Sequence, residues 1–495
     1  MAPRTLSSRA AGGFLWMLFQ TLGSKLVGLV AQIFLARLLE PKDFGLVAIA
    51  YMVLAIPSML RQSGIGQILV QKGPRLERWG SSAFWLDLAL GALSTAVMLG
   101  LAPIAARAYH TPELFGLISL VASAAFFNSA MVLPTAILNR DLRFREMAAV
   151  GMGYNFLAAA LSVLFAYCGL GAYSFVLPLP ICLALRCVVL FCLTRPRIRW
   201  GPQPHRWRAL APDSLRMLSA GFFAVITVQF DVFSLSLFDR KSAVGQYAFA
   251  SNLSGQVLTL MAINLGSVLF PVLSKIANDA PRQTAAFLRA CRALALIGIP
   301  LCLGEALLAR PGVRVVFGAK WHVAAMLLSV LACAAAIKLV GGSAGSLLLA
   351  QGRYHTNMVW AIINAVAFCA AVFCGAFFGG ATGVAAASLI SALLVSPALV
   401  WQTVRVGGGN WRDVSRVYVP PVIISAVALL PAWLLVMCMR AGVTGDIIQV
   451  AVGLLSAPPI YLLLACKFMP ADVAELAAHL GPIGRILRRL HLISA

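Results

Sequence analysis

Long apolar runs separated by short polar segments dominate the chain. A helix of about 20 apolar residues spans the hydrocarbon core of a bilayer. Fourteen runs are predicted as membrane-spanning helices, near residues 11–38, 44–70, 80–107, 114–138, 148–168, 172–194, 215–238, 244–274, 284–308, 322–350, 357–378, 381–403, 418–439 and 447–466. The first run is too long for the apolar part of a signal peptide, so it is interpreted as the first membrane helix.

The basic residues gather in every second connecting segment. If the N-terminus is cytoplasmic, 26 Lys and Arg residues fall on the cytoplasmic side and nine on the opposite side. This excess predicts that both termini are cytoplasmic, and its regular alternation favours fourteen spans. The same distribution explains the net charge of +23, because most of the basic residues set the membrane topology. A nucleic-acid partner is therefore not predicted.

The composition agrees with a polytopic membrane protein. Apolar residues make up 61% of the chain, charged residues 11%, and the mean hydropathy is +0.90, whereas soluble domains are about 45–50% apolar and about 25% charged. The 11 Cys are scattered through apolar stretches without C-x-x-C spacing. They are interpreted as small core residues, so neither a metal site nor a cofactor is predicted.

An internal repeat divides the chain. The longest cytoplasmic connection separates the first twelve helices into six and six, which predicts an N-terminal lobe at 1–194, a basic linker at 195–216, a C-terminal lobe at 217–404, and two further helices with a basic tail at 405–495. Five pairs of identical residues share one offset of 200: Gly45/Gly245, Ala48/Ala248, Ala50/Ala250, Gly66/Gly266 and Leu69/Leu269. Parallel repeats of this kind place a substrate site at their interface in transporters.

Four charged residues lie deep inside apolar runs: Lys25, Arg61, Asp231 and Lys338. A charge in hydrocarbon costs at least ~2.5–3.5 kcal/mol, so it normally faces a partner or a watery cavity. For Arg61 a bidentate phosphate contact and an interfacial position are both open, and for Lys338 a cavity position and a structural role are both open. Three further charged residues lie nearer helix ends and are expected to reach the interface: Asp87, Arg186 and Glu305.

Two of these charges belong to polar stripes. Thr21, Lys25, Gly28 and Gln32 share one face of the first helix at 3.6 residues per turn, and Thr227, Asp231 and Ser234 form a similar stripe on the seventh helix, its repeat counterpart. The Lys25 ammonium and the Asp231 carboxylate are expected to pair across an empty cavity, and a diphosphate would displace that pairing. A static salt bridge, or side chains reaching the membrane boundary, is the alternative interpretation.

Five segments carry a resemblance to a known family: LARLLEPKDFGLVAIA (35–50), SGIGQILVQK (63–72), PTAILNRDLRFREMA (134–148), FGAKW (317–321) and QGR (351–353). They resemble the polysaccharide transporter family of the MOP (multidrug/oligosaccharidyl-lipid/polysaccharide) flippase superfamily, and in particular WzxC-type exopolysaccharide and O-antigen flippases of bacterial inner membranes. The resemblance implies an all-α fold with two six-helix lobes around a central cavity and two C-terminal helices.

The same resemblance implies alternating access and outward flipping of an undecaprenyl-diphosphate-linked oligosaccharide. The cavity candidates for binding this substrate are Lys25, Arg61, Asp231, Gln32, Thr21 and Lys338. Membrane lipids, a polysaccharide polymerase and export machinery are the expected partners of a monomeric protein.

Two other classes of protein fit the sequence less well. An enzyme is not expected, because the sequence contains no P-loop, no H-E-x-x-H and no D-x-D pair. A polymerase or ligase would be expected to carry a sizeable periplasmic loop, whereas the longest outward segment spans only 309–321. An ion-coupled multidrug antiporter of the same superfamily is the second candidate. Basic residues outnumber acidic ones within the predicted spans, which fits anionic cargo better than cationic drugs.

Overall fold

A computed structural model describes residues 6–59, 76–141, 143–196, 198, 225–259, 269, 273–274, 276, 279–438 and 442–479. The described residues form helices and turns, and no strand occurs among them. Within this part of the chain, 11 helices are long and apolar enough to cross a membrane. Each of the fourteen predicted runs is mainly helical over its described residues, with short turns inside some of them, so the all-helical membrane fold is confirmed and the count of fourteen is consistent with it.

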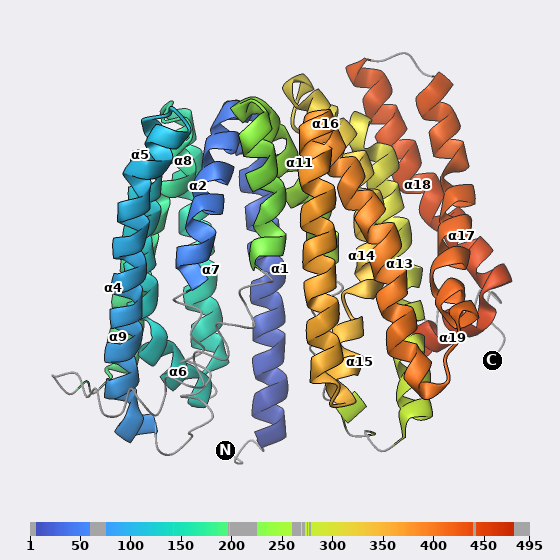
Figure 1. The fold of residues 1–495 in the computed structure, drawn as a ribbon, viewed down its shortest axis with the longest axis horizontal. Coiled ribbons are helices and arrows are strands. Elements are labelled where there is room, and N and C mark those ends of the chain that lie inside the picture. The colour runs from blue at the N-terminus through green and yellow to red at the C-terminus, as the bar shows by residue number, and fades with distance from the viewer. Residues whose placement is uncertain are drawn as a thin grey trace. The chain divides into compact units, whose positions relative to one another are not determined.

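The chain divides into two compact units, Met1–Phe233 and Ser234–Ala495. The division lies within the helix Val225–Phe238, whereas the sequence predicts a second lobe that begins at residue 217. The first unit contains the following helices (blue to green in Figure 1): α1 (Leu6–Leu38), α2 (Pro41–Met59), α4 (Leu76–Ala108), α5 (Glu113–Ala130), α6 (Val132–Arg140), α7 (Phe144–Tyr167), α8 (Tyr173–Val176) and α9 (Pro178–Thr194).

The second unit begins with α11 and ends with α19 in the described part of the chain. Its helices are α11 (Lys241–Leu258), α13 (Ala280–Val316), η3 (Ala319–Trp321), α14 (His322–Gly341), α15 (Ala344–Ala350), α16 (Tyr354–Val404), η4 (Arg405–Gly407), α17 (Trp411–Cys438), α18 (Val443–Phe468) and α19 (Pro470–His479).

Small residues let the helices of the first unit approach closely. A Cβ added to Gly91 of α4 would lie 2.2 Å from Ser129 Oγ on α5, and one added to Gly151 of α7 would lie 2.2 Å from the Gln20 amide on α1. Close approach through glycine is typical of helix packing in membranes, where apolar burial alone gives no driving force. These contacts hold α4 against α5 and α1 against α7.

Helix α16 is a hairpin. Its two arms, seen in Figure 1 as neighbouring orange helices, meet at Gly380, whose φ of 54° is left-handed. A Cβ added to Gly383 would lie 2.0 Å from the main-chain oxygen of Gly375, so only glycine permits this approach of the arms. The two arms correspond to the predicted runs 357–378 and 381–403, which confirms that these residues form two helical segments.

The FGAKW segment is a packing element of the second unit. Trp321 is fully buried, and its ring stacks on Phe249 of α11 with centroids 4.1 Å apart. Phe317 meets the same Phe249 ring edge to face at 5.0 Å. Gly318 between them has φ 103°, which L side chains rarely adopt. This segment therefore holds η3 and α14 against α11.

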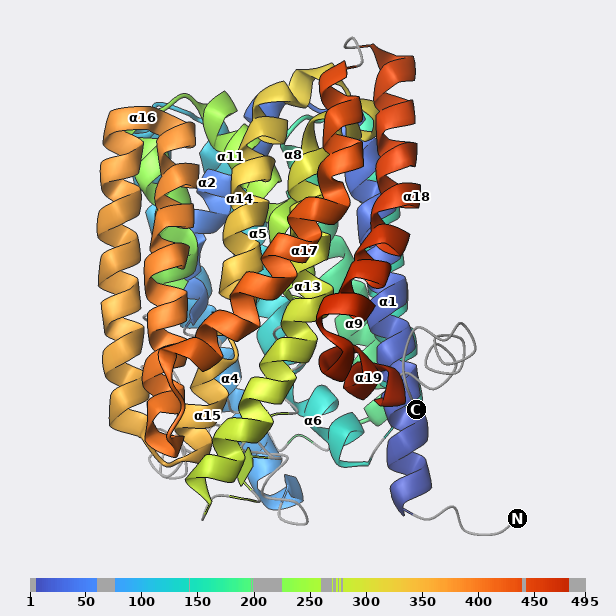
Figure 2. The same cartoon turned by 90° about the vertical axis from the view of Figure 1, so that its right-hand side faces the viewer.

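The last helices of the second unit pack on α13. Figure 2 shows α17 and α18 side by side, with α19 at the lower end of α18. A buried cluster joins Leu296 of α13, Ile424 of α17 and Val473 of α19. At the other end of α18, Arg314 Nη1 of α13 lies 3.1 Å from Asp446 Oδ2. The two predicted C-terminal helices are thus integral parts of the second unit.

Candidate substrate-binding site

Helix α1 presents three faces that differ in chemistry. One face packs on α7, where the Asn155 amide donates a hydrogen bond to Ser24 Oγ at 2.9 Å. The opposite face is apolar and exposed, and Leu26 is 65% exposed. The predicted stripe of Thr21, Lys25, Gly28 and Gln32 lies between these faces at 3.6 residues per turn. The stripe is therefore separate from both the packing face and the most exposed apolar face.

Lys25 is the charged member of this stripe. Its side chain is half-buried, and the described residues give its ammonium neither a hydrogen bond nor an ion pair. Gly28, one turn further along, has no atom within 4 Å of an added Cβ. A cation with open space beside it in an apolar helix can accept an anionic ligand.

Asp231 occupies a more enclosed position on the helix Val225–Phe238. It is 8% exposed, and its Oδ1 accepts a hydrogen bond from the main-chain amide of Val232 at 2.7 Å. Asp231 belongs to the first unit, as Lys25 does. Their pairing stays a prediction.

Lys338 has identified partners in the second unit. Its Nζ donates a hydrogen bond to Ser388 Oγ at 3.0 Å and lies 4.9 Å from the centroid of the Phe368 ring. A hydroxyl acceptor and an aromatic face both stabilise an ammonium that has left water. Lys338 therefore links α14 to both arms of α16. Arg61, the remaining candidate, lies outside the described residues.

The first unit contains a partly open cavity that no sequence pattern predicts. Its volume is about 550 Å³, and it lies among α2, α4, α5, α7, α9 and the beginning of the helix Val225–Phe238. Its polar lining consists of two phenols, two carboxamides and a hydroxyl: Tyr51, Tyr154, Asn128, Gln229 and Ser58. No hydropathy signal marks these residues, because they are uncharged and scattered over four helices.

Arg186 contacts Tyr154, one of the residues that line this cavity. Its guanidinium carbon lies 5.3 Å from the centroid of the Tyr154 ring. Its Nε is buried and has no hydrogen-bond partner among the described residues. The sequence predicts that Arg186 reaches the membrane interface, and the structure adds a cation–π contact within the unit.

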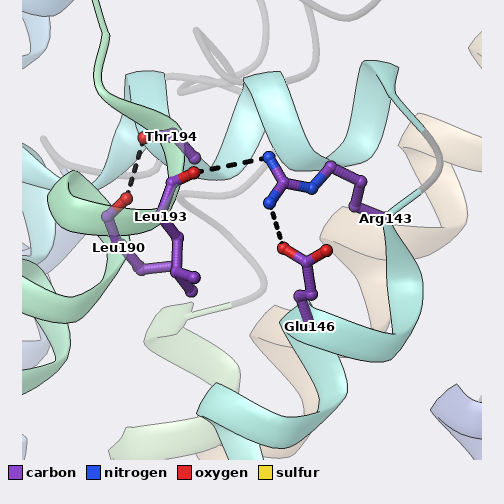
Figure 3. A network of polar contacts seen from close by, with 5 residues as sticks. All are labelled: Arg143, Glu146, Leu190, Leu193 and Thr194. Atoms are coloured by element: carbon purple, nitrogen blue, oxygen red, sulfur yellow. Dashed lines mark hydrogen bonds and ion pairs between the residues drawn. The ribbon is translucent and has the colours of Figure 1, made fainter.

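Two charged residues of the segment PTAILNRDLRFREMA, Arg143 and Glu146, form polar contacts near the end of α9 (Figure 3). Arg143 donates one hydrogen bond to the main-chain oxygen of Leu193 at 3.4 Å and another to the carboxylate of Glu146. The last carbonyls of a helix lack partners within that helix, so the first of these bonds satisfies the end of α9. Arg143 and Glu146 therefore connect α7 to α9 rather than forming a ligand site.

Many apolar helices, close glycine-mediated packing and charged or polar groups held within the spans define a polytopic membrane transporter. Residues 34–327 match the family model described as polysaccharide biosynthesis protein. The chain belongs to this family, whose members and structural neighbours are transporters and not enzymes.

Three similar proteins illustrate the relationship. The succinoglycan biosynthesis transport protein ExoT of Rhizobium meliloti is 26% identical over 72% of this chain and 72% of its own length. The lipopolysaccharide biosynthesis protein WzxC of Escherichia coli is 23% identical over 74% of this chain and 75% of its own. The structure of the lipid II flippase MurJ in an inward closed conformation superposes with a TM-score of 0.73 at 16% identity, covering 92% of this chain and 98% of that one.

Proposed function

We propose that this protein is a flippase that moves an undecaprenyl-diphosphate-linked oligosaccharide repeat unit from the cytoplasmic to the periplasmic leaflet of a bacterial inner membrane. It does so by alternating access and supplies exopolysaccharide or O-antigen synthesis. Family membership supports the biosynthetic role. The similarity to ExoT, a succinoglycan biosynthesis transport protein, and to MurJ, a lipid II flippase, supports a lipid-linked cargo.

One observation carries the proposal for the headgroup. The Lys25 ammonium is half-buried on the polar stripe of α1, with no ion pair among the described residues and with open space beside Gly28. A diphosphate supplies the negative charge and the hydrogen-bond acceptors that such an ammonium needs. Thr21 and Gln32 extend the stripe with neutral hydrogen-bonding groups, and Asp231 is the proposed partner of Lys25 when no cargo is bound.

The membrane potential favours the proposed direction. An inside-negative potential is worth ~2.3 kcal/mol per elementary charge per 100 mV, so outward movement of an anionic headgroup is downhill unless bound cations cancel its charge. Both termini lie in the cytoplasm in this proposal, as the basic residues predict. A polymerase and export machinery on the periplasmic side would use the oligosaccharide unit after it is flipped. The proposed working form is the monomer.

Deletion of the gene tests the function directly. Lipid-linked repeat units should accumulate in the cytoplasmic leaflet, and surface polymer should disappear, with both effects reversed by the wild-type gene. Leaflet position is measured by the accessibility of the glycan to a lectin in right-side-out and inverted vesicles. Normal polymer together with new sensitivity to cationic drugs would replace the proposal with the antiporter, and single repeat units accumulating outside would indicate a polymerase.

A further inference from the structure

The cavity of the first unit is built for an uncharged polar ligand. No described residue that lines it carries a charge, so the described part of the lining offers no group that pairs with a diphosphate or a cationic drug. Most of its lining is apolar, with a few polar groups among α2, α5, α7 and the helix Val225–Phe238. A volume of about 550 Å³ lies in the range of small-molecule sites, roughly 300–1,000 Å³.

The polar groups of the cavity are available to a ligand. Ser58 donates a local hydrogen bond to the main-chain oxygen of Ala55 at 2.6 Å. Among the described residues, the phenol of Tyr51 and the carboxamides of Asn128 and Gln229 have no hydrogen-bond partner. Tyr51 is 38% exposed, which fits a cavity that is partly open to its surroundings. These groups therefore face the open volume instead of satisfying each other.

This combination matches the chemistry of a sugar. A carboxamide both donates and accepts hydrogen bonds, as the vicinal hydroxyls of a sugar require. The apolar face of a pyranose ring packs on an aromatic ring, and Tyr154 supplies such a ring in the lining. The apolar part of the lining, which includes Leu183 and Ala125, complements the same C–H face.

We propose that this cavity binds a neutral sugar residue of the cargo, at a site distinct from the Lys25 stripe that binds the diphosphate. The inference rests on the proposed function for the identity of the cargo. Tyr51, Asn128 and Gln229 hydrogen-bond the hydroxyls, and Tyr154 stacks on the ring. Glycan and headgroup are thus recognised by different side chains of the same unit.

Two probes separate the sites on the purified full-length protein in nanodiscs. The first is the oligosaccharide repeat released from the host's own polymer by mild acid, free of lipid and phosphate. The second is inorganic pyrophosphate. Binding of each is measured by saturation-transfer NMR and titration. Asn128→Leu and Tyr51→Phe should weaken binding of the oligosaccharide about tenfold each, because each removes a hydrogen-bonding group, while binding of pyrophosphate is unchanged.

Lys25→Ala should show the opposite pattern, with pyrophosphate binding lost and oligosaccharide binding retained. Tyr173→Phe is the matched control, because it removes a phenol of the same unit whose hydroxyl donates to the Glu113 main-chain oxygen at 3.2 Å outside the cavity. Ala125→Leu fills the cavity without touching a polar group, and it should also weaken oligosaccharide binding. Thermal melting is recorded for every variant, and Asn128→Leu and Tyr51→Phe decide the test if Ala125→Leu melts lower than the wild type.

The proposal would be overturned if the variants Asn128→Leu, Tyr51→Phe and Ala125→Leu bound the oligosaccharide with the affinity of the wild type. It would also be overturned if the folded wild-type protein did not bind the oligosaccharide. The outcome is separable from that of the proposed function. If the deletion strain still exports polymer while the cavity binds the oligosaccharide, the flippase proposal fails and the sugar site stands. If export requires the gene but the cavity variants bind normally, the sugar site fails alone.

Discussion

Asp239 and Gly380 form a contact that closes the α16 hairpin of the second unit. Asp239 Oδ2 accepts a hydrogen bond from the main-chain amide of Ala381 at 3.3 Å, and a Cβ added to Gly380 would lie 2.7 Å from the same oxygen. Asp239 lies between the helix Val225–Phe238 and α11. It therefore ties the junction between the helix Val225–Phe238 and α11 to the turn of the hairpin.

The first unit contains a matching contact. A Cβ added to Gly171 would lie 3.2 Å from Asp43 Oδ1, and Gly171 has the same φ of 54° as Gly380. Asp43 lies in the first turn of α2, directly after the α1–α2 junction. Gly171 lies in the turn between α7 and α8, which leads to the sixth predicted span. This repeated relationship supports two parallel repeats independently of the residue matches at offset 200.

We predict that Gly380→Ala destabilises the protein by about 1–2 kcal/mol, because an L residue in the left-handed region is strained and its Cβ would crowd the Asp239 carboxylate. The measurement is the apparent melting temperature from fluorescence-detected size-exclusion chromatography. Gly379→Ala is the control, since the nearest atom to its added Cβ lies 3.9 Å away. Equal stability of the two variants would contradict the strain argument.

Trp321→Ala should lower the stability of the second unit by about 3–5 kcal/mol, the usual cost of removing a fully buried large aromatic side chain. The stack on Phe249 at 4.1 Å is lost together with the burial. Trp433 is 41% exposed, so Trp433→Ala serves as the control and should have a small effect. The readout is thermal inactivation in one detergent. A similar loss in both variants would assign the effect to tryptophan in general.

The ion pair between Arg314 and Asp446 should respond unequally to the loss of each partner. The Asp446 side chain is 6% exposed and that of Arg314 is 41% exposed. Arg314→Met leaves a buried carboxylate without this partner and should cost about 1–3 kcal/mol, whereas Asp446→Asn leaves a guanidinium that reaches solvent and should cost less. Thermal melts of both variants test this order, and the reverse order would contradict it.

Topology follows from the basic residues and can be tested with reporter fusions. Fusions after Arg107 and Lys241 should be periplasmic, and fusions after Arg145 and Arg412 should be cytoplasmic. Alkaline phosphatase and green fluorescent protein report the two sides. A cytoplasmic result at Lys241 would remove the six-plus-six arrangement and the parallel repeat with it.

The sequence predicted what depends on local pattern. Hydropathy located every described helix that is long and apolar enough to cross a membrane, including both arms of α16. The length of an apolar run alone determines whether it can cross the hydrocarbon core of a bilayer. It also isolated the α1 stripe, because one helical period relates Thr21, Lys25 and Gln32. The role of Trp321 was not predictable, since its partner Phe249 is distant in sequence and the contact exists only after packing.

The cavity of the first unit is not predictable from the sequence for a related reason. Its polar groups are neutral, and single Tyr, Asn and Gln residues in membrane helices are common enough to carry no signal in one sequence. The sequence does not distinguish a cavity position from a structural role for Lys338, because it does not identify the partners of the ammonium. Ser388 and Phe368 become its neighbours only through the fold of α16.

The sharpest test of the headgroup site is Lys25→Ala. Export of polymer, normalised to the amount of protein in the membrane, should fall severely, because the proposed diphosphate contact is lost while removal of an intramembrane charge does not hinder insertion. Asp231→Asn should also reduce export at unchanged abundance, because it removes the carboxylate charge that is proposed to pair with Lys25 when no cargo is bound.

Two variants of the same helix control this experiment. Leu26→Ala changes the neighbouring exposed apolar face and should export normally. Lys25→Arg keeps the charge and should retain part of the export, because a guanidinium also binds phosphate but with a different geometry. If Lys25→Ala exported like the wild type at equal abundance, the cationic site on α1 would be wrong. If export fell only in proportion to the amount of protein, Lys25 would have a structural role, because each molecule that reached the membrane would still transport normally.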